Sequence, residues 1–301
     1  MSSMNNRQLF FQHLAQTSDK PIGIEVASAE GIYIKDVHGK KFVDMIAGFS
    51  VCNIGHSHPD VIQAIQQQVE KYMHVIVYGE FIQAPQVQYA KALTNLLPEN
   101  LQSVYFTSSG AEATEGAMKL AKRVTKRTKI ISFIGGYHGS TQGAMSIMGF
   151  EERKSAYRPL LPGIEYIGFN NDEDLLKIGA KTAAVVLETI QGGAGFIIPK
   201  NGYLRKVKKR CEEVGALLIL DEIQPGMGRT GKLFAFETFG IVPDILVMGK
   251  GLGGGFPIGA FSTSPTLMKL IQTDPILGHI TTFGGHPVIA SAALATLQQI
   301  T

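Results

Sequence analysis

The feature that most constrains this chain is a regular alternation of short apolar runs with runs of helical periodicity. Runs that read as strands cover residues 103–107, 129–134, 183–188, 216–221 and 245–248, and helical patterns cover 59–72, 85–97, 111–126 and 203–214. The strand-like runs are apolar on both faces, which is typical of strands buried between two layers of helices. The sequence therefore predicts an α/β fold with a mostly parallel central sheet and helices on both faces.

The first 46 residues have a different pattern. Apolar and polar side chains alternate over residues 22–26, 31–35 and 41–44, with turn residues such as His38 and Gly39 between them. We therefore expect a small segment of short antiparallel strands at residues 1–46, followed by one large domain at residues 47–301.

Composition excludes several classes of protein. With 45% hydrophobic and 18% charged residues among 301, the chain can bury a large core and is not disordered. Its net charge of +3, without a basic stripe, predicts no nucleic-acid partner. No apolar run reaches the roughly 18 residues of a membrane span, and the amino terminus lacks the apolar core of a signal peptide. Two cysteines are too few for a disulfide framework, so the cytoplasm is the expected compartment.

Ligands of open parallel sheets bind beyond the carboxyl ends of the strands, so the residues that follow each strand form the candidate site. After residues 103–107 come Ser109, Gly110 and Ala111, which lead directly into a helix. Small residues at a helix start leave backbone N–H groups free, which suits a phosphate group. Ordinary capping of the helix by serine accounts for the same residues, and both interpretations stay open.

Three further strand ends carry residues of distinctive chemistry. Tyr137 and His138, set among glycines, suit a ring placed against a flat ligand, although one packed tyrosine gives the same pattern. Asp221 ends an apolar strand, where a carboxylate needs a protonated ring nitrogen, a metal, an arginine or a capping role. Lys250 stands among glycines, where a lowered pKa would make its amine a nucleophile; a solvated loop lysine is the alternative.

Other interpretations of these segments agree less well with the sequence. Gly249, Gly251 and Gly254 match the spacing of a dinucleotide-binding fingerprint, but a proline-containing segment follows where that fingerprint requires a helix. A P-loop needs Ser or Thr after its lysine, and glycine stands there. His56 and His58 could chelate a metal, but no third ligand lies near them in the sequence, so we expect no metal site.

Together the strand ends fit one cofactor, pyridoxal 5′-phosphate (PLP). This cofactor needs an amine for a Schiff base, an acid beside its ring nitrogen, an aromatic face and a phosphate cradle. Lys250, Asp221, Tyr137 and the turn at 109–111 supply these in that order. A carboxylate raises the pKa of the ring nitrogen, and the protonated ring is what acts as an electron sink.

The sequence resembles the class III PLP-dependent aminotransferases of fold type I, the group that contains ornithine, acetylornithine and 4-aminobutyrate aminotransferases. The most specific stretch, residues 217–259, contains Asp-Glu-Ile-Gln at 221–224, Gly-Arg-Thr-Gly at 228–231 and Gly-Lys-Gly-Leu-Gly-Gly-Gly at 249–255. Supporting matches are Gly-His-Ser-His-Pro at 55–59, Ser-Gly-Ala-Glu-Ala at 109–113, Gly-Tyr-His-Gly at 136–139, Glu-Thr-Ile-Gln-Gly at 188–192 and Thr-Thr-Phe-Gly-Gly at 281–285. The resemblance runs from about residue 31 to residue 295.

The resemblance implies a role for each matching residue. Lys250 is the lysine of the Schiff base, Asp221 the partner of the ring nitrogen, and Gln224 the neighbour of the ring's 3-oxygen. Tyr137 is the stacking aromatic, with His138 beside it in the cofactor site.

The phosphate and the subunit interface are implied in the same way. Ser109, Gly110 and Ala111 form the phosphate loop, and Glu188 supports the active-site end of its strand. Thr282 reaches the phosphate of a neighbouring subunit, which implies a homodimer with active sites at the interface.

The implied activity is transfer of an amino group from an amino acid or terminal amine to an oxo acid, with 2-oxoglutarate the expected acceptor, by ping-pong kinetics. A PLP-dependent aminomutase, racemase or decarboxylase shares the same motifs and stays an alternative. Two further alternatives stay open: a cofactor-binding fragment with little activity and, because of the glycine spacing, a dinucleotide-dependent enzyme.

Three departures from the family pattern bear on this activity. Gly193 stands where ornithine-type members carry Glu, and Ser140 stands where they often carry Arg. Both family residues handle substrate carboxylates, so specificity for ornithine or acetylornithine does not transfer directly. Family members also continue into a carboxy-terminal small domain with a substrate-binding arginine, whereas this chain ends at Thr301, within a helix expected from about Pro287. We expect that domain to be absent, and residues 1–301 alone to bind cofactor but to turn over poorly.

Overall fold

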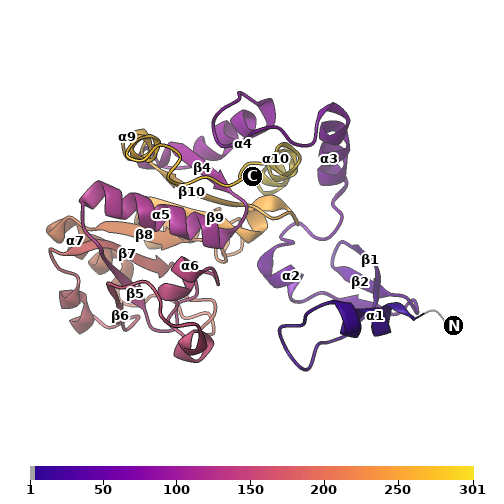
Figure 1. Ribbon diagram of the computed structural model, residues 1–301, viewed down its shortest axis with the longest axis horizontal. Coiled ribbons are helices and arrows are strands. Elements are labelled where there is room, and N and C mark those ends of the chain that lie inside the picture. Colours follow the sequence, from indigo (N-terminus) through magenta and orange to yellow (C-terminus); the bar gives the residue numbers. More distant parts are fainter. Residues whose placement is uncertain (1–3) are drawn as a thin grey trace.

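The computed structural model, which describes residues 4–301, is built around a seven-stranded sheet (Figure 1). Its strands are β4 (Ser103–Thr107), β5 (Lys129–Phe133), β6 (Ile164–Ile167), β7 (Thr182–Glu188), β8 (Leu217–Asp221), β9 (Ile245–Gly249) and β10 (Gly259–Thr263). They stand in the order β4-β10-β9-β8-β7-β5-β6. All neighbours pair in parallel except β10, which is antiparallel to both β4 and β9.

Helices cover both faces of this sheet. On one face, α5 (Gly110–Thr125) and α9 (Pro265–Met268) share a buried apolar cluster with the strands. On the other face the cluster includes α4 (Ala84–Thr94), α7 (Tyr203–Val214) and α10 (Pro287–Ile300). Alternate residues of β7 enter the two clusters, Ala184 on one side and Val185 on the other. Because both faces of the strand are buried, its sequence is continuously apolar.

The remaining elements are shorter or lie outside the sheet. α3 (Pro59–Lys71) packs against α10. The short helices are α2 (Ala47–Ser50), α6 (Gln142–Ser146) and α8 (Phe236–Phe239), with 3₁₀ turns at 99–101, 151–153, 155–157, 173–177, 250–253 and 269–272. No helix within residues 4–301 is long and apolar enough to cross a membrane.

The amino-terminal part forms its own small sheet, seen at the lower right of Figure 1. It contains α1 (Asn6–His13) and the antiparallel strands β1 (Val26–Glu30), β2 (Tyr33–Asp36) and β3 (Lys41–Val43). The strand predicted at 22–26 is wrong, since β1 begins where that prediction ends. A two-residue turn at Gly31 and Ile32 pairs Glu30 with Tyr33, so the hairpin register moves both strands toward the carboxyl terminus.

The predicted fold class is confirmed: the central sheet is mostly parallel and carries helices on both faces. β4 and α7 match their predicted bounds, and the other predicted sheet strands and helices differ from theirs by up to three residues at an end. The sequence pattern missed β6 and β10. The division predicted between residues 46 and 47 falls directly before α2 and stays a prediction.

Candidate active site

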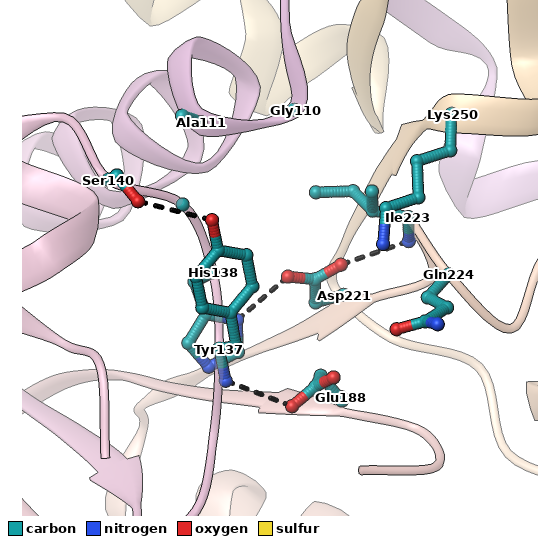
Figure 2. Close-up of a pocket in the computed structure, with 11 residues that line it drawn as sticks. Gly110, Ala111, Tyr137, His138, Ser140, Glu188, Asp221, Ile223, Gln224 and Lys250 are labelled. Atoms are coloured by element: carbon teal, nitrogen blue, oxygen red, sulfur yellow. Dashed lines mark hydrogen bonds and ion pairs between the residues drawn. The ribbon is translucent and has the colours of Figure 1, made fainter. Parts of the chain in front are cut away.

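A cavity of about 220 Å³ lies beyond the carboxyl ends of the parallel strands (Figure 2). It is lined by Gly110, Ala111, Tyr137, His138, Gly139, Ser140, Glu188, Asp221, Ile223, Gln224 and Lys250. Eight of the ten residues predicted for the cofactor site are among them; Ser109 and Thr282 are not. The eight come together because parallel strands bring their carboxyl ends to one edge of the sheet.

Lys250 directly follows β9 and opens the 3₁₀ turn at 250–253. Its backbone has φ +47°, the left-handed region that non-glycine residues rarely adopt, which indicates local strain at this position. Its side chain extends toward Asp221 in Figure 2. Burial lowers the pKa of the Lys250 amine, and the charge of Arg229 adds to this, although Asp221 and Glu188 act in the opposite direction.

Asp221 ends β8 and is almost completely buried. Its Oδ2 lies 2.7 Å from Nδ1 of the equally buried His138, and its Oδ1 accepts a hydrogen bond from the Ile223 N–H at 2.9 Å. Burial lowers the pKa of His138, but the hydrogen bond and charge of Asp221, with Glu188, raise that pKa above its ordinary value overall. A carboxylate has about four acceptor sites, so Asp221 can still accept a bond from a ligand.

Glu188 ends β7 and holds two loops by their backbones. Its Oε2 accepts from the Tyr137 N–H at 3.0 Å, and its Oε1 accepts from the Gly192 N–H at 3.1 Å. Burial raises the pKa of the Glu188 carboxyl to about 7. The side chain therefore fixes the backbone from which the Tyr137 ring projects, and the Tyr137 hydroxyl lies 3.1 Å from Oγ of Ser140.

The start of α5 is compatible with both interpretations that the sequence left open, helix capping by serine and phosphate binding. Ser109 is the N-cap, and its Oγ accepts from the Glu112 N–H at 3.2 Å. Gly110 and Ala111 come next, and N–H groups in the first turn of a helix have no partner within it. A Cβ at Gly110 would lie 2.6 Å from Cδ1 of Ile223, so glycine allows this turn to approach the Asp221 loop.

The other two predicted residues differ in position. Gln224 lines the cavity, and its Nε2 donates to Oγ of Ser50 at 3.4 Å. Thr282 is exposed and lies outside the cavity lining, so its predicted contact with a neighbouring subunit stays a prediction.

Two residues beside Asp221 have roles that the sequence did not predict. Ile223 lines the cavity, and its side chain packs against both Gly110 and Gly249. Glu222 is buried and accepts hydrogen bonds from the Thr189 hydroxyl and from the backbone of Ala235 and Phe236. A glutamate within an apolar stretch was the available signal for the second, because a buried carboxylate requires partners.

The residues present fit PLP. An amine, a buried carboxylate, an aromatic ring and a helix start that offers unpaired N–H groups all line one cavity. The dinucleotide interpretation fits poorly, because the glycines at 249–254 lie in and around a 3₁₀ turn and the antiparallel strand β10 follows them, where the fingerprint requires an α-helix.

Comparison with known proteins agrees with this chemistry. The model of the family "Aminotransferase class-III" matches residues 14–301. An acetylornithine aminotransferase from Methanopyrus kandleri is 38% identical over 300 residues, which cover 99% of this chain and 75% of the relative. The ornithine aminotransferase of Toxoplasma gondii has a TM-score of 0.90 at 30% identity, covering 97% of this chain and 69% of that one. The taurine:2-oxoglutarate aminotransferase of Bifidobacterium kashiwanohense, solved with PLP and glutamate, also gives 0.90 at 30% identity, covering 99% and 73%.

The chain belongs to the class III aminotransferase family. It is a PLP-dependent transaminase, as the strand-end residues predicted, and its substrates are an amino donor and an oxo-acid acceptor.

Proposed function

We propose that this aminotransferase takes its amino group from a terminal primary amine, with 2-oxoglutarate as the acceptor. The observation that carries the donor class is the wall beside Tyr137, which the uncharged residues Ser140, Phe150 and Gly193 form. The Ser140 hydroxyl there faces the Tyr137 hydroxyl. A Cβ at Gly193 would lie 3.3 Å from the Phe150 ring. A charged group at the far end of the donor would lose its hydration against this wall without a charged partner among these residues.

Each residue of the site has a role in this proposal. Lys250 would hold the cofactor by its amine, Asp221 would contact the ring nitrogen, and Gln224 the 3-oxygen. Tyr137, with His138 beneath it, would face the ring. Bound PLP supplies an electron sink that makes the proton on the amine-bearing carbon acidic. Nζ of Lys250, with its lowered pKa, accepts that proton and returns it as a general base and acid.

The phosphate would be held at the start of α5. The N–H groups of Gly110 and Ala111 offer donors, and the positive end of the helix dipole favours an anion there. Glu188 holds the backbone of Tyr137 so that the ring stays at the cavity wall.

The acceptor brings two carboxylates, and Arg229 is the cation we assign to one of them. Arg229 donates to Oδ1 of Asn53, and Nδ2 of Asn53 lies so close to Gly251, next to Lys250, that a Cβ at Gly251 would clash with it. Its charge acts on the Lys250 amine. Arg229→Ala should raise the KM for 2-oxoglutarate at least about tenfold with a smaller effect on the KM for the amine, in line with the loss of one charged hydrogen bond. Arg205→Ala is the matched control, because Arg205 is exposed like Arg229 but lies on α7, outside the cavity lining, where it donates to the Phe239 carbonyl.

Borohydride reduction of the PLP-loaded protein, followed by peptide mapping, tests the site. The label should appear on Lys250 and vanish in Lys250→Ala, and a label elsewhere would refute the assignment. Glutamate formation from 2-oxoglutarate then tests the donor. The simple amine 1-aminobutane should outperform 4-aminobutyrate, which carries a carboxylate at its far end, and the opposite order would refute the donor class.

The active enzyme is proposed to be a homodimer with active sites at the interface. Apolar side chains are exposed in two segments, at Met73 and Ile82 and at Phe283, and the rings of His74 and Phe283 connect the segments at 5.0 Å. A solvent-exposed apolar surface of this kind suits an obligate partner. Thr282 lies within the second segment.

A mixed dimer tests whether Thr282 serves the partner's site. Neither Lys250→Ala nor Thr282→Glu chains should be active alone. Random mixing should restore about a quarter of wild-type activity, because half of the dimers then have one intact site. No recovery would show that Thr282 acts only within its own chain, if at all.

The cytoplasm is the proposed compartment. Cys52 and Cys211 are both free thiols, which suits a reducing environment. Cell fractionation with an antibody to the chain tests this, and recovery with secreted proteins would contradict it.

A further inference from the structure

Glu115 lies on α5, between the helix start at Gly110 and the middle of the helix, and takes no part in the cavity lining. Its Oε1 accepts hydrogen bonds from the Thr141 hydroxyl, from the Gly143 N–H at 3.0 Å and from the Ala144 N–H at 3.3 Å. All three donors belong to the start of α6. One carboxylate thus joins the helix that begins at the proposed phosphate site to the helix that follows the Tyr137 loop.

The start of α6 depends on this carboxylate. Thr141 occupies the N-cap position but makes no side-chain cap bond of its own, because its hydroxyl donates to Glu115. The N–H groups in the first turn of a helix otherwise lack partners, and α6 has only five residues. A Cβ at Gly143 would lie 2.6 Å from the Glu115 carboxylate, so glycine permits the close approach.

The segment between these two contacts carries the groups that face the ligand. Glu188 holds its beginning at the Tyr137 N–H, and Glu115 holds its end at Thr141. Between them Gly139 passes directly over the start of α5, since a Cβ there would lie 2.5 Å from Cβ of Ala111. The position of the Tyr137 ring and of Ser140 relative to Gly110 and Ala111 is therefore set from both ends of one short loop.

We infer that Glu115 is a positioning residue, which fixes the separation between the phosphate-binding helix start and the Tyr137–Ser140 wall. The inference rests on the proposed roles of Gly110, Ala111 and Tyr137. Glu115 does not touch substrate or cofactor. Its loss should let the 137–141 loop move away from α5, which would weaken cofactor binding and tilt the ring that Tyr137 faces.

The test compares Glu115→Ala and Glu115→Gln in the full chain loaded with PLP. Four quantities are measured: the PLP dissociation constant, the induced circular dichroism of the visible PLP band, and the KM and kcat for the amine. Glu115→Ala should weaken PLP binding about tenfold, as expected from the loss of a helix cap, reduce the induced dichroism and raise KM more than it lowers kcat. Glu115→Gln keeps an acceptor oxygen and should stay within about threefold of wild type.

Two further variants keep the outcome interpretable. Thr141→Val removes one of the three bonds with little change in volume, and should shift the same quantities in the same direction by less, even if Glu115→Ala folds poorly. Glu70→Ala on α3 is the matched control, because Glu70 is an exposed helical glutamate, and it should change nothing.

The results separate this inference from the proposed function. If Glu115→Ala and Thr141→Val lower only the melting temperature and leave PLP affinity, dichroism and KM unchanged, Glu115 is a structural cap and the inference is overturned alone. If the wild-type chain itself gives no PLP band, the proposed function fails first, before any variant is compared.

Discussion

His138 and Asp221 form a buried pair beneath the cavity, with Nδ1 of the imidazole 2.7 Å from Oδ2 of the carboxylate. The pair joins the ends of two strands that are not adjacent in the sheet, β5 and β8. Nε2 of His138 is buried without a hydrogen-bond partner within residues 4–301. This geometry suits a histidine that holds the Asp221 carboxylate in place, so that the negative charge of Asp221 stays available to a ligand in the cavity.

Two His138 variants test this role. His138→Leu leaves a buried carboxylate without its partner and should cost about 3 kcal/mol of unfolding free energy, with a large loss of PLP affinity. His138→Asn keeps a donor near the position of Nδ1 and should lose much less of both. Urea unfolding and PLP titration measure the two effects. Equal losses in the two variants would show that the ring volume matters rather than the hydrogen bond.

The same pair predicts a pH dependence. The folded-state pKa of His138 is raised, so its contribution to stability is complete below the ordinary value of 6.5 and is lost as pH rises through the folded value. Wild type should therefore lose its advantage over His138→Asn as pH rises above the ordinary value of 6.5 and through the raised folded value. A constant difference in unfolding free energy across that range would contradict the prediction.

Glu222 predicts a second pH effect in the same direction. Burial raises the pKa of its carboxyl from 4.5 to about 7, despite the bonds from Thr189, Ala235 and Phe236. The folded chain therefore binds a proton that the unfolded chain releases, and this contribution is lost as pH rises from about 4.5 to above 7. Relative to Glu222→Gln, wild type should lose up to about 3 kcal/mol over that interval, as measured by urea unfolding of the cofactor-free chain.

Much of the scaffold could be predicted because it depends on local patterns. A strand buried on both faces must be apolar throughout, which identified β5, β7, β8 and β9, and the amphipathic period identified α7. β10 was missed because Gly259–Thr263 directly follows a glycine-rich turn with a proline, and because its antiparallel pairing with β4 is set by tertiary contacts.

The candidate site was only partly predictable, because the contacts between its side chains are also set by tertiary structure. Parallel strands bring their carboxyl ends together, so Lys250, Asp221 and Tyr137 could be grouped from sequence. The hydrogen-bond partners of these side chains could not be predicted, since His138 is 83 residues from Asp221 and Glu115 is 26 residues from Thr141. No spacing rule connects residues on different elements at such separations.

Ser109 offers a test of the two interpretations that its sequence position left open. Ser109→Ala removes the cap bond to the Glu112 N–H and should lower the stability of the cofactor-free chain by about 1 kcal/mol. If the Ser109 hydroxyl also binds the phosphate, PLP affinity should fall at least about tenfold, which is more than the loss of the cap bond explains. Ser109→Thr keeps the hydroxyl and is the control. Reduced stability with unchanged PLP affinity would leave Ser109 as a cap only.

The wall beside Tyr137 predicts how the donor specificity can be changed. The φ of Gly193 lies outside the left-handed region that favours glycine, but a Cβ there would lie 3.3 Å from the Phe150 ring and 3.4 Å from Cβ of Tyr137. Gly193→Glu should therefore crowd Tyr137 and weaken PLP binding, and Phe150→Ala should relieve the crowding in the double variant. The added carboxylate should then favour a donor with a second amine. The double variant should therefore prefer the diamine 1,4-diaminobutane to the monoamine 1-aminobutane more strongly than wild type does. The ratio of the two kcat/KM values measures this preference. Phe150→Ala alone is the control for the enlarged space, and an unchanged ratio in the double variant would place the distal end of the donor away from this wall.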